Sequence, residues 1–168
     1  MNRAVAALAM LVAVCHPAAA RAEDGALTKT ASIVVHVHAS ADAAFPLFDP
    51  VNETKWDPEW KPRLLGDRVD EGLVFVVGDG DGKSTWLIDR YDVSTRSIGY
   101  VVVGKSLLTR IAIHVAPAGT QSTATVTYTR TALDDDGRNA VERFAAHFPT
   151  QAPHWEGAIN GYLASVAR

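Results

Sequence analysis

Cysteine, long apolar runs and a basic excess are missing from most of this chain, and each absence excludes a class of protein. Cys15 is the only cysteine in 168 residues, which rules out an internal disulfide. After residue 22 no stretch provides the about 20 consecutive apolar residues that a membrane-spanning helix needs. The 16 basic residues are outnumbered by 19 acidic ones, so no basic stripe for nucleic acid is expected. A hydrophobic core alone must therefore hold the fold.

The first 22 residues have the composition of a secretory signal peptide. Arg3 precedes a short apolar run, and Ala20-Arg21-Ala22 fits the small-x-small rule of signal peptidase. A lipoprotein signal is the weaker alternative, because Cys15 lacks the small residue that should precede it. We expect cleavage after Ala22, a periplasmic or secreted location, and a mature chain of residues 23–168 that contains no cysteine.

The middle of the chain has the pattern of an antiparallel sheet. Alternating residues from Ile33 to Val37 build one apolar face, which predicts a strand over residues 30–39. Ser40 suits the N-cap of a short helix over residues 40–48, and a second helical turn is expected over residues 51–55. Six more strands follow without an intervening helix, which favours antiparallel pairing. Their expected ranges are 64–69, 72–77, 83–92, 98–103, 107–115 and 121–133.

Residues 134–168 change to a helical pattern. Three consecutive aspartates, Asp134 to Asp136, suit a helix N-terminus, where carboxylates accept from free amides and oppose the helix dipole. Pro149 and Pro153 interrupt the pattern, so we expect a long C-terminal helix that is broken around residues 148–152. The fold class predicted is α+β: a curved antiparallel sheet of about seven strands, two short helices after the first strand, and this interrupted helix lying over the sheet.

The most unusual segment is Trp56-Asp57-Pro58-Glu59-Trp60-Lys61-Pro62. Each proline fixes its own φ and pushes the preceding residue toward an extended conformation, so the segment is neither a regular helix nor a strand. It is a shaped loop that carries a large aromatic area. Because binding residues concentrate on such loops, we expect it to close the mouth of an apolar cavity.

The order of elements resembles the START-like, or SRPBCC, superfamily of helix-grip proteins, and in particular its polyketide cyclase/dehydrase-like branch. Ile33–Ala41 is similar to the first strand and helix start of that branch, Tyr128–Leu133 to its last strand, and Trp155–Leu163 to its final helix. The loop of residues 56–62 is similar to its tryptophan-bearing loop. The resemblance covers nearly all of residues 23–168, which we expect to form a single domain. It implies a ligand cavity, but no catalytic set and no cofactor, because the superfamily shares none.

A curved sheet with a helix across its concave side leaves a gap, and ligand sites are typically concave, mostly apolar spaces with a few polar anchors. Arg130 shares a strand face with Tyr128, so an inward face would bury a cation that needs an anion or carbonyl partner. Arg90 raises the same question beside Trp86. Packing in the core is the competing interpretation for the strand and helix tryptophans, and a solvent-exposed head for Arg130. The predicted ligand-binding residues are Trp56, Trp60, Trp86, Tyr100, Tyr128, Arg130 and Trp155.

Two further motifs favour structural interpretations. His36 and His38 share one strand face, as two metal ligands would, but the opposite face is apolar, so both should point to solvent and no metal site is predicted. The segment Gly78–Ser84 resembles a phosphate-binding loop, yet only three residues separate Gly78 from Gly82 and no helix follows. A hairpin turn is the simpler interpretation.

Two functions are compatible with these observations, and a third is an alternative to both. The first is an exported, non-catalytic protein that binds a small hydrophobic molecule, such as a lipid, polyketide, isoprenoid or aromatic compound. The second is a cyclase/dehydrase-type enzyme that acts on such a molecule, which requires a strongly perturbed ionisable group inside the cavity. The third, a ligand-free interaction module, is expected if side chains fill the cavity.

Overall fold

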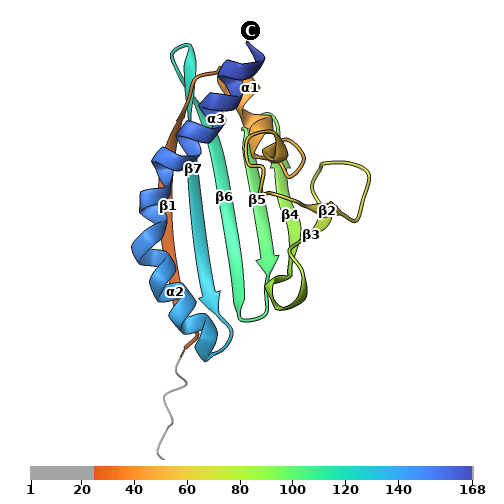
Figure 1. Ribbon diagram of the computed structural model, residues 1–168, viewed down its shortest axis with the longest axis vertical. Coiled ribbons are helices and arrows are strands. Elements are labelled where there is room, and N and C mark those ends of the chain that lie inside the picture. The colour runs from red at the N-terminus through yellow and green to blue at the C-terminus, as the bar shows by residue number, and fades with distance from the viewer. Residues whose placement is uncertain (1–24, 168) are drawn as a thin grey trace, which may run out of the picture.

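The computed structural model describes residues 25–167 (Figure 1). The predicted signal peptide, residues 1–22, lies outside the described residues. Within residues 25–167, no helix combines the length and the apolar character needed to cross a membrane.

The described chain alternates little between helix and sheet: one strand comes first, helical turns follow, and six strands precede the final helices. The strands are β1 (Thr28–Val37), β2 (Arg63–Leu64), β3 (Val74–Val77), β4 (Ser84–Asp92), β5 (Ser97–Val103), β6 (Leu107–Ala118) and β7 (Gln121–Ala132). The α-helices are α1 (Ala41–Ala44), α2 (Asp135–His147) and α3 (Ala152–Val166), and the 3-10 turns are η1 (Phe45–Phe48), η2 (Glu53–Lys55), η3 (Gly80–Gly82) and η4 (Phe148–Gln151).

The strands form a single curved antiparallel sheet in the order β1-β7-β6-β5-β4-β3-β2. The first strand therefore pairs with the last, and the remaining neighbours are consecutive hairpins. The helices α2 and α3 run over the β1 and β7 side of the sheet, while α1 and the loop that follows it cover the upper part of β4 and β5 (Figure 1). This is the helix-grip arrangement predicted from the sequence, and the α+β fold class is confirmed.

Two strands are much shorter than predicted. We expected strands over residues 64–69 and 72–77, but β2 has two residues and β3 begins at Val74. After β2 the chain turns away, because Leu65 faces solvent and Gly72 adopts a φ of 90°, which favours glycine. The connection between these strands is therefore a wide turn instead of a tight hairpin.

The segment after β1 and the C-terminal segment follow their sequence signals closely. The Ser40 side chain accepts from the Ala43 amide at the start of α1, and the Asp134 carboxylate accepts from the Gly137 amide, 2.8 Å away, at the start of α2. The predicted break in the C-terminal helix is the 3-10 turn η4, which begins at Phe148 and carries Pro149. The second interrupting proline, Pro153, lies in the first turn of α3, where a proline needs no hydrogen-bond partner.

Side chains of α3 bond to the backbone of the outer strand β1. The His36 amide donates to Glu156 (2.9 Å), and the His38 amide donates to the Asn160 side-chain oxygen (2.8 Å). The Asn160 amide group donates in return to the His36 carbonyl (2.9 Å). These bonds fix the angle at which α3 crosses the sheet. Both histidine side chains face solvent, as predicted.

The outer face of the sheet is polar. Three hydroxyl pairs join β1 to β7 along this face: Thr28 to Thr131, Thr30 to Thr129, and Ser32 to Thr127, each with oxygens 2.8–2.9 Å apart. The inner face carries the aliphatic and aromatic core. It includes Ile33, Val35 and Val37 of β1, which the alternating pattern placed on one face.

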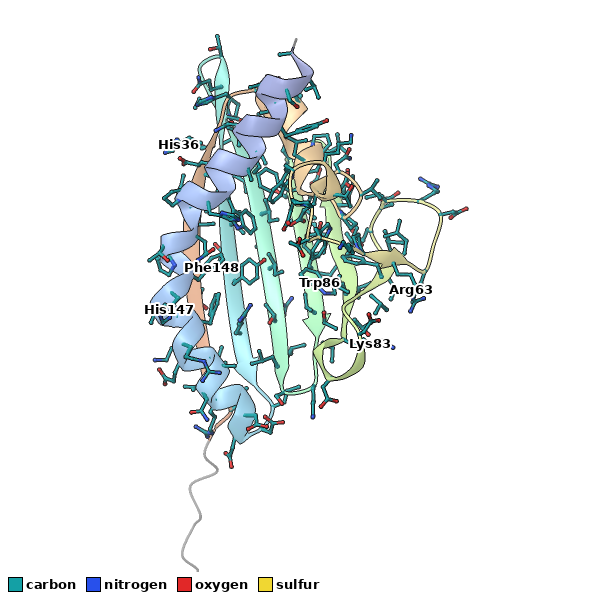
Figure 2. All side chains as sticks on the ribbon, in the orientation of Figure 1. His36, Arg63, Lys83, Trp86, His147 and Phe148 are labelled. Carbon is teal, nitrogen blue, oxygen red and sulfur yellow. The ribbon has the colours of Figure 1, made fainter. Side chains whose placement is uncertain are left out.

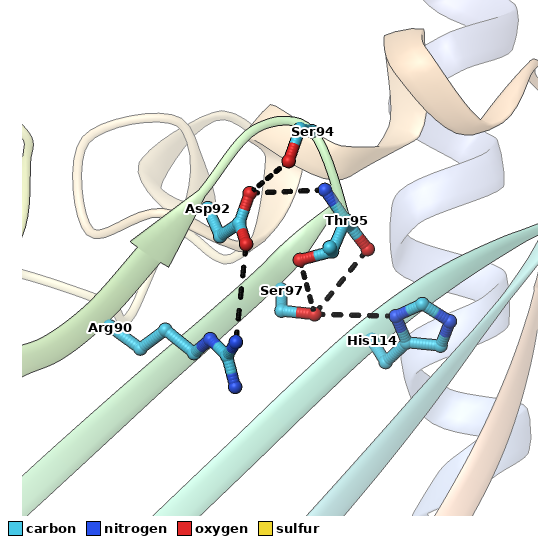
Figure 3. A network of polar contacts seen from close by, with 6 residues as sticks. All are labelled: Arg90, Asp92, Ser94, Thr95, Ser97 and His114. Carbon is cyan, nitrogen blue, oxygen red and sulfur yellow. Dashed lines mark hydrogen bonds and ion pairs between the residues drawn. The ribbon is translucent and has the colours of Figure 1, made fainter.

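Arg90 lies on this outer face and not toward the cavity. Alternation from Trp86 and Ile88 would place it inward, but the register of β4 shifts between Ile88 and Arg90, so Asp89 and Arg90 are both exposed. The Arg90 guanidinium approaches Asp92 at 3.9 Å, in a network that also includes Ser97 and His114 (Figure 3).

Candidate ligand cavity

A cavity of about 390 Å³ lies between the concave face of the sheet, the turn η2 with its following loop, and helix α3. A narrower recess of about 30 Å³ continues it inward, toward Phe48 and Tyr100. The outer part is lined from β4, β5, β6 and β7, from η2 and the loop after it, and from α3. Its residues are Glu53, Asp57, Trp60, Ser84, Trp86, Val102, Gly104, Leu107, Thr109, Ile111, Tyr128, Arg130 and Trp155.

One wall of the cavity is an aromatic cluster. The Trp60 ring meets the Trp86 ring edge to face, with centroids 5.1 Å apart, and Trp86 stacks on Phe75 at 5.5 Å. Tyr100 meets Trp86 at 5.7 Å, and its hydroxyl donates to the Phe48 carbonyl at 2.7 Å. Aromatic pairs in these geometries pack rigidly, so this wall is preformed.

The tryptophan loop lines part of the cavity through Asp57 and Trp60, and its two tryptophans have different places. The Trp60 indole nitrogen donates to the Pro50 carbonyl (2.9 Å), which holds the ring against the aromatic wall. The Trp56 indole donates to the Leu47 carbonyl (2.7 Å) and packs on Trp155 with centroids 5.6 Å apart. Trp56 is 7% exposed and does not line the cavity. It therefore supports Trp155 from behind.

The opposite wall contains Tyr128 and Arg130 of β7. The Tyr128 ring packs on Phe148 of the helix break at 4.7 Å, and the Arg130 guanidinium lies over the Phe144 ring at 4.2 Å. In Figure 2, Phe148 lies on the β7 side of the concave face and Trp86 lies on the β4 side. Burial raises the pKa of the Tyr128 hydroxyl and lowers the pKa of Arg130.

The structure adds Glu53 of η2, which the sequence analysis missed. Its carboxyl lines both the cavity and the inner recess. Burial, and to a lesser degree the negative charges of Asp57 and Asp49, raise its pKa to about 8. A signal existed in the sequence: Glu53 precedes Trp56 by three residues in a helical turn, so both share the face of that turn that points inward.

The structure brings most of the predicted site residues together. Trp60, Trp86, Tyr128, Arg130 and Trp155 line the cavity, and Tyr100 lines the inner recess. Ligand contact at these residues stays a prediction, as does any role for Trp56, which lies in the core behind the wall.

A larger hollow of about 600 Å³ lies on the outer face of the sheet. It is bordered by Arg90, Arg110 and the threonines of β7, and it has no aromatic lining. Its walls are exposed side chains on a solvated sheet face. The cavity on the concave face, which has aromatic side chains in its lining, is therefore the better candidate for a ligand site.

Fold and cavity together define a helix-grip protein whose concave face holds a cavity with an aromatic wall. Solved structures confirm this fold. Norcoclaurine synthase from Thalictrum flavum in complex with dopamine and hydroxybenzaldehyde has a TM-score of 0.63 at 17% identity, and the match covers 83% of this chain and 88% of that chain. Major latex-like protein 151 from Panax ginseng has a TM-score of 0.55 at 19% identity, with 72% and 97% covered.

DynU16, a protein of the dynemicin biosynthetic locus, has a TM-score of 0.55 at 16% identity, and the match covers 80% of this chain and 47% of that chain. No protein-family model matches the chain, and no curated protein matches it by sequence. The solved structures thus confirm the helix-grip fold that the sequence predicted.

Proposed function

We propose that this protein binds a small, hydrophobic and largely aromatic molecule in its cavity. The observation that carries this proposal is the cavity itself, which has a preformed aromatic wall and only a few polar groups. Its volume of about 390 Å³ lies within the about 300–1,000 Å³ typical of small-molecule sites. Support also comes from the norcoclaurine synthase of the same fold, whose structure holds dopamine and hydroxybenzaldehyde. A ligand-free interaction module has less support, because it was expected only if side chains filled the cavity.

The fluorescent probe N-phenyl-1-naphthylamine, which is neutral and aromatic, tests this proposal. We expect saturable binding with increased probe fluorescence. The variant Leu107→Trp adds an indole at the cavity wall and should weaken binding at least about tenfold, because the added ring occupies the ligand space. The variant Val103→Trp adds the same ring on the exposed face of β5 and should bind like the wild type. Absence of saturable binding, or equal loss in both variants, contradicts the proposal.

A cyclase-type enzyme is the second candidate, and Glu53 favours it. A carboxyl group with a pKa near 8 inside an apolar cavity can accept or donate a proton near neutral pH. The Tyr128 hydroxyl and the Arg130 guanidinium line the same space and could stabilise an oxyanion. Together these groups suit removal of a proton from a carbon next to a carbonyl, which is the first step of an aldol-type cyclisation.

Deuterium exchange tests this second candidate without knowledge of the substrate. The methyl ketone 2-acetylnaphthalene, incubated in deuterated buffer with the protein, should gain deuterium at its methyl group faster than in buffer alone. The variant Glu53→Gln should lose this acceleration while it still binds the neutral probe. If wild type and variant give the buffer rate, the cavity binds without acid–base chemistry.

We also propose that the protein acts outside the cytoplasm. The feature that supports this is the signal-like composition of residues 1–22. Protein recovered from a periplasmic extract or the medium should have a mass that corresponds to a start at Glu23. Recovery of only the full-length chain from the cytoplasm contradicts it.

A further inference from the structure

We propose that the natural ligand carries an anionic oxygen, such as a carboxylate, phenolate or enolate, and that Arg130 binds this oxygen. This inference rests on the proposed binding function and specifies the chemistry of its ligand. The apolar body would occupy the aromatic part of the cavity, and the anionic group would lie beside β7.

The first argument is that the Arg130 side chain has an unpaired buried donor. Its Nε atom is buried and forms no hydrogen bond with any described residue. A buried donor without a partner destabilises the folded chain, and more so where the group is charged. The aromatic faces of Phe144, at 4.2 Å, and Tyr128, at 5.8 Å, offset only part of this cost. A ligand anion beside the guanidinium would offset the rest of this cost.

The second argument is a contrast with the other arginines. Five of them approach an aspartate within 4.0 Å, whereas none of the ion pairs within residues 25–167 includes Arg130. The paired residues are Arg68, Arg90, Arg96, Arg110 and Arg138. Arg63 and Arg143 are also absent from these ion pairs, but both are exposed to solvent, whereas Arg130 is partly buried on the cavity wall. Buried cations normally have a partner, so Arg130 is the arginine of the described residues for which a partner is missing.

The third argument is the distribution of charge along the cavity. Glu53 is mostly protonated at pH 7, because burial raises its pKa to about 8, so it does not neutralise Arg130. Asp57, the other acidic residue of the lining, accepts from the Glu59 amide in the loop (2.9 Å). Both acidic residues come from the η2 side, and Arg130 comes from the β7 side. An anion is therefore favoured beside β7 and disfavoured beside η2.

The position of Arg130 also gives an orientation. Arg130 lines the outer part of the cavity, near Leu107 and Gly104 of the β5–β6 hairpin, but not the inner recess. The recess is lined by Phe48, Tyr100 and other largely apolar groups. A ligand that enters with its apolar end first would leave its anionic group at Arg130.

A matched pair of competitors tests the inference. Naphthalene-2-carboxylate and naphthalene-2-carboxamide have nearly the same shape but differ in charge at pH 7. Each is used to displace N-phenyl-1-naphthylamine from the protein. A hydrogen bond to a charged group contributes about 1.5–3 kcal/mol, so the carboxylate should bind roughly ten- to a hundredfold more tightly than the carboxamide. Arg130→Gln should reduce this ratio to about one, and Arg130→Lys should keep part of it.

The control is Arg110→Gln, which removes an equal charge from the neighbouring strand on the outer face. Arg110→Gln should leave the carboxylate-to-carboxamide affinity ratio unchanged. If it lowers the ratio as Arg130→Gln does, the preference follows the net charge of the protein and not contact with Arg130. If the wild type binds the neutral probe but does not prefer the carboxylate, the anion inference is overturned while the proposed function stands. If the wild type binds no probe, the proposed function fails as well. If only Arg130→Gln loses probe binding, that variant is misfolded. The carboxylate-to-carboxamide affinity ratio in the wild type and in Arg130→Lys then tests the anion inference.

Discussion

The carboxyl group of Glu53 should make the stability of this protein depend on pH in an unusual direction. In the folded chain its pKa is raised to about 8 from the ordinary 4.5, chiefly by burial. Between these two values the folded chain holds a proton that the unfolded chain releases, so the folded state is favoured by low pH. The contribution is fully present below about pH 4.5 and is lost as pH rises to about 8.

The magnitude follows from the size of this difference. Each pH unit over which only the folded state is protonated changes the free energy of unfolding by about 1.4 kcal/mol, which sets an upper limit of about 5 kcal/mol. The cavity is open to solvent on one side, and water there screens the carboxylate. Between pH 5.5 and pH 9 the limit is about 3.4 kcal/mol, and with screening we expect the wild type to lose on the order of 1–3 kcal/mol from this group.

The variant Glu53→Gln keeps the shape of the side chain but cannot ionise. Urea unfolding at pH 5.5, 7, 8 and 9 should show that the stability of the variant relative to the wild type rises with pH and levels off above pH 8. Histidines and other groups titrate equally in both proteins and cancel in this difference. Glu59→Gln, an exposed change in the same loop, is the control and should give a flat difference. If the free energy of unfolding changes with pH in the same way in the wild type and in Glu53→Gln, the raised pKa of Glu53 is refuted.

Three substitutions test the packing around the site. Asn160→Ala removes two hydrogen bonds to the β1 backbone and should lower the free energy of unfolding by about 1–3 kcal/mol in urea titrations, and a wild-type value would contradict the role of these bonds. Gly137→Ala should destabilise by about 1–3 kcal/mol, because the added Cβ collides with the Ser106 carbonyl oxygen, and thermal unfolding measures the effect. Gly157→Ala, at a position of α3 where a Cβ meets no other atom, should instead raise the free energy of unfolding by about 0.5–1 kcal/mol, because alanine has the higher helix propensity. A lower free energy of unfolding would contradict this.

The fold was predictable because its signals are local and repeated. The alternating residues of β1, Ser40 and Asp134 as caps, and the prolines of the C-terminal segment each act within a few residues. The short β2 was not predictable, because the apolar residues after it suggested a strand, whereas the chain turns at Leu65. The direction of Arg90 was left open by the sequence, and the structure decides it through one extra residue in β4 that reverses the inward and outward positions.

The site could be predicted in part. Strand alternation placed Tyr128 and Arg130 on one face but left open whether that face points inward, and the tryptophan loop was expected to close a cavity. The sequence could not distinguish the positions of Trp56 and Trp60. Each position depends on the backbone carbonyl that accepts a hydrogen bond from the indole, and the sequence pattern does not show which carbonyl that is. Glu53 escaped notice because its raised pKa comes from burial by elements distant in the sequence.

The bonds from α3 to β1 have a consequence for the behaviour of many copies of this chain. A sheet that does not close into a barrel has two borders, and a free border can recruit strands from other molecules until fibres grow. Here Glu156 and Asn160 already occupy amide and carbonyl groups of one border, and β2 provides only two residues at the other. The molecule can therefore hold its cavity open without presenting a long template on which its neighbours could polymerise.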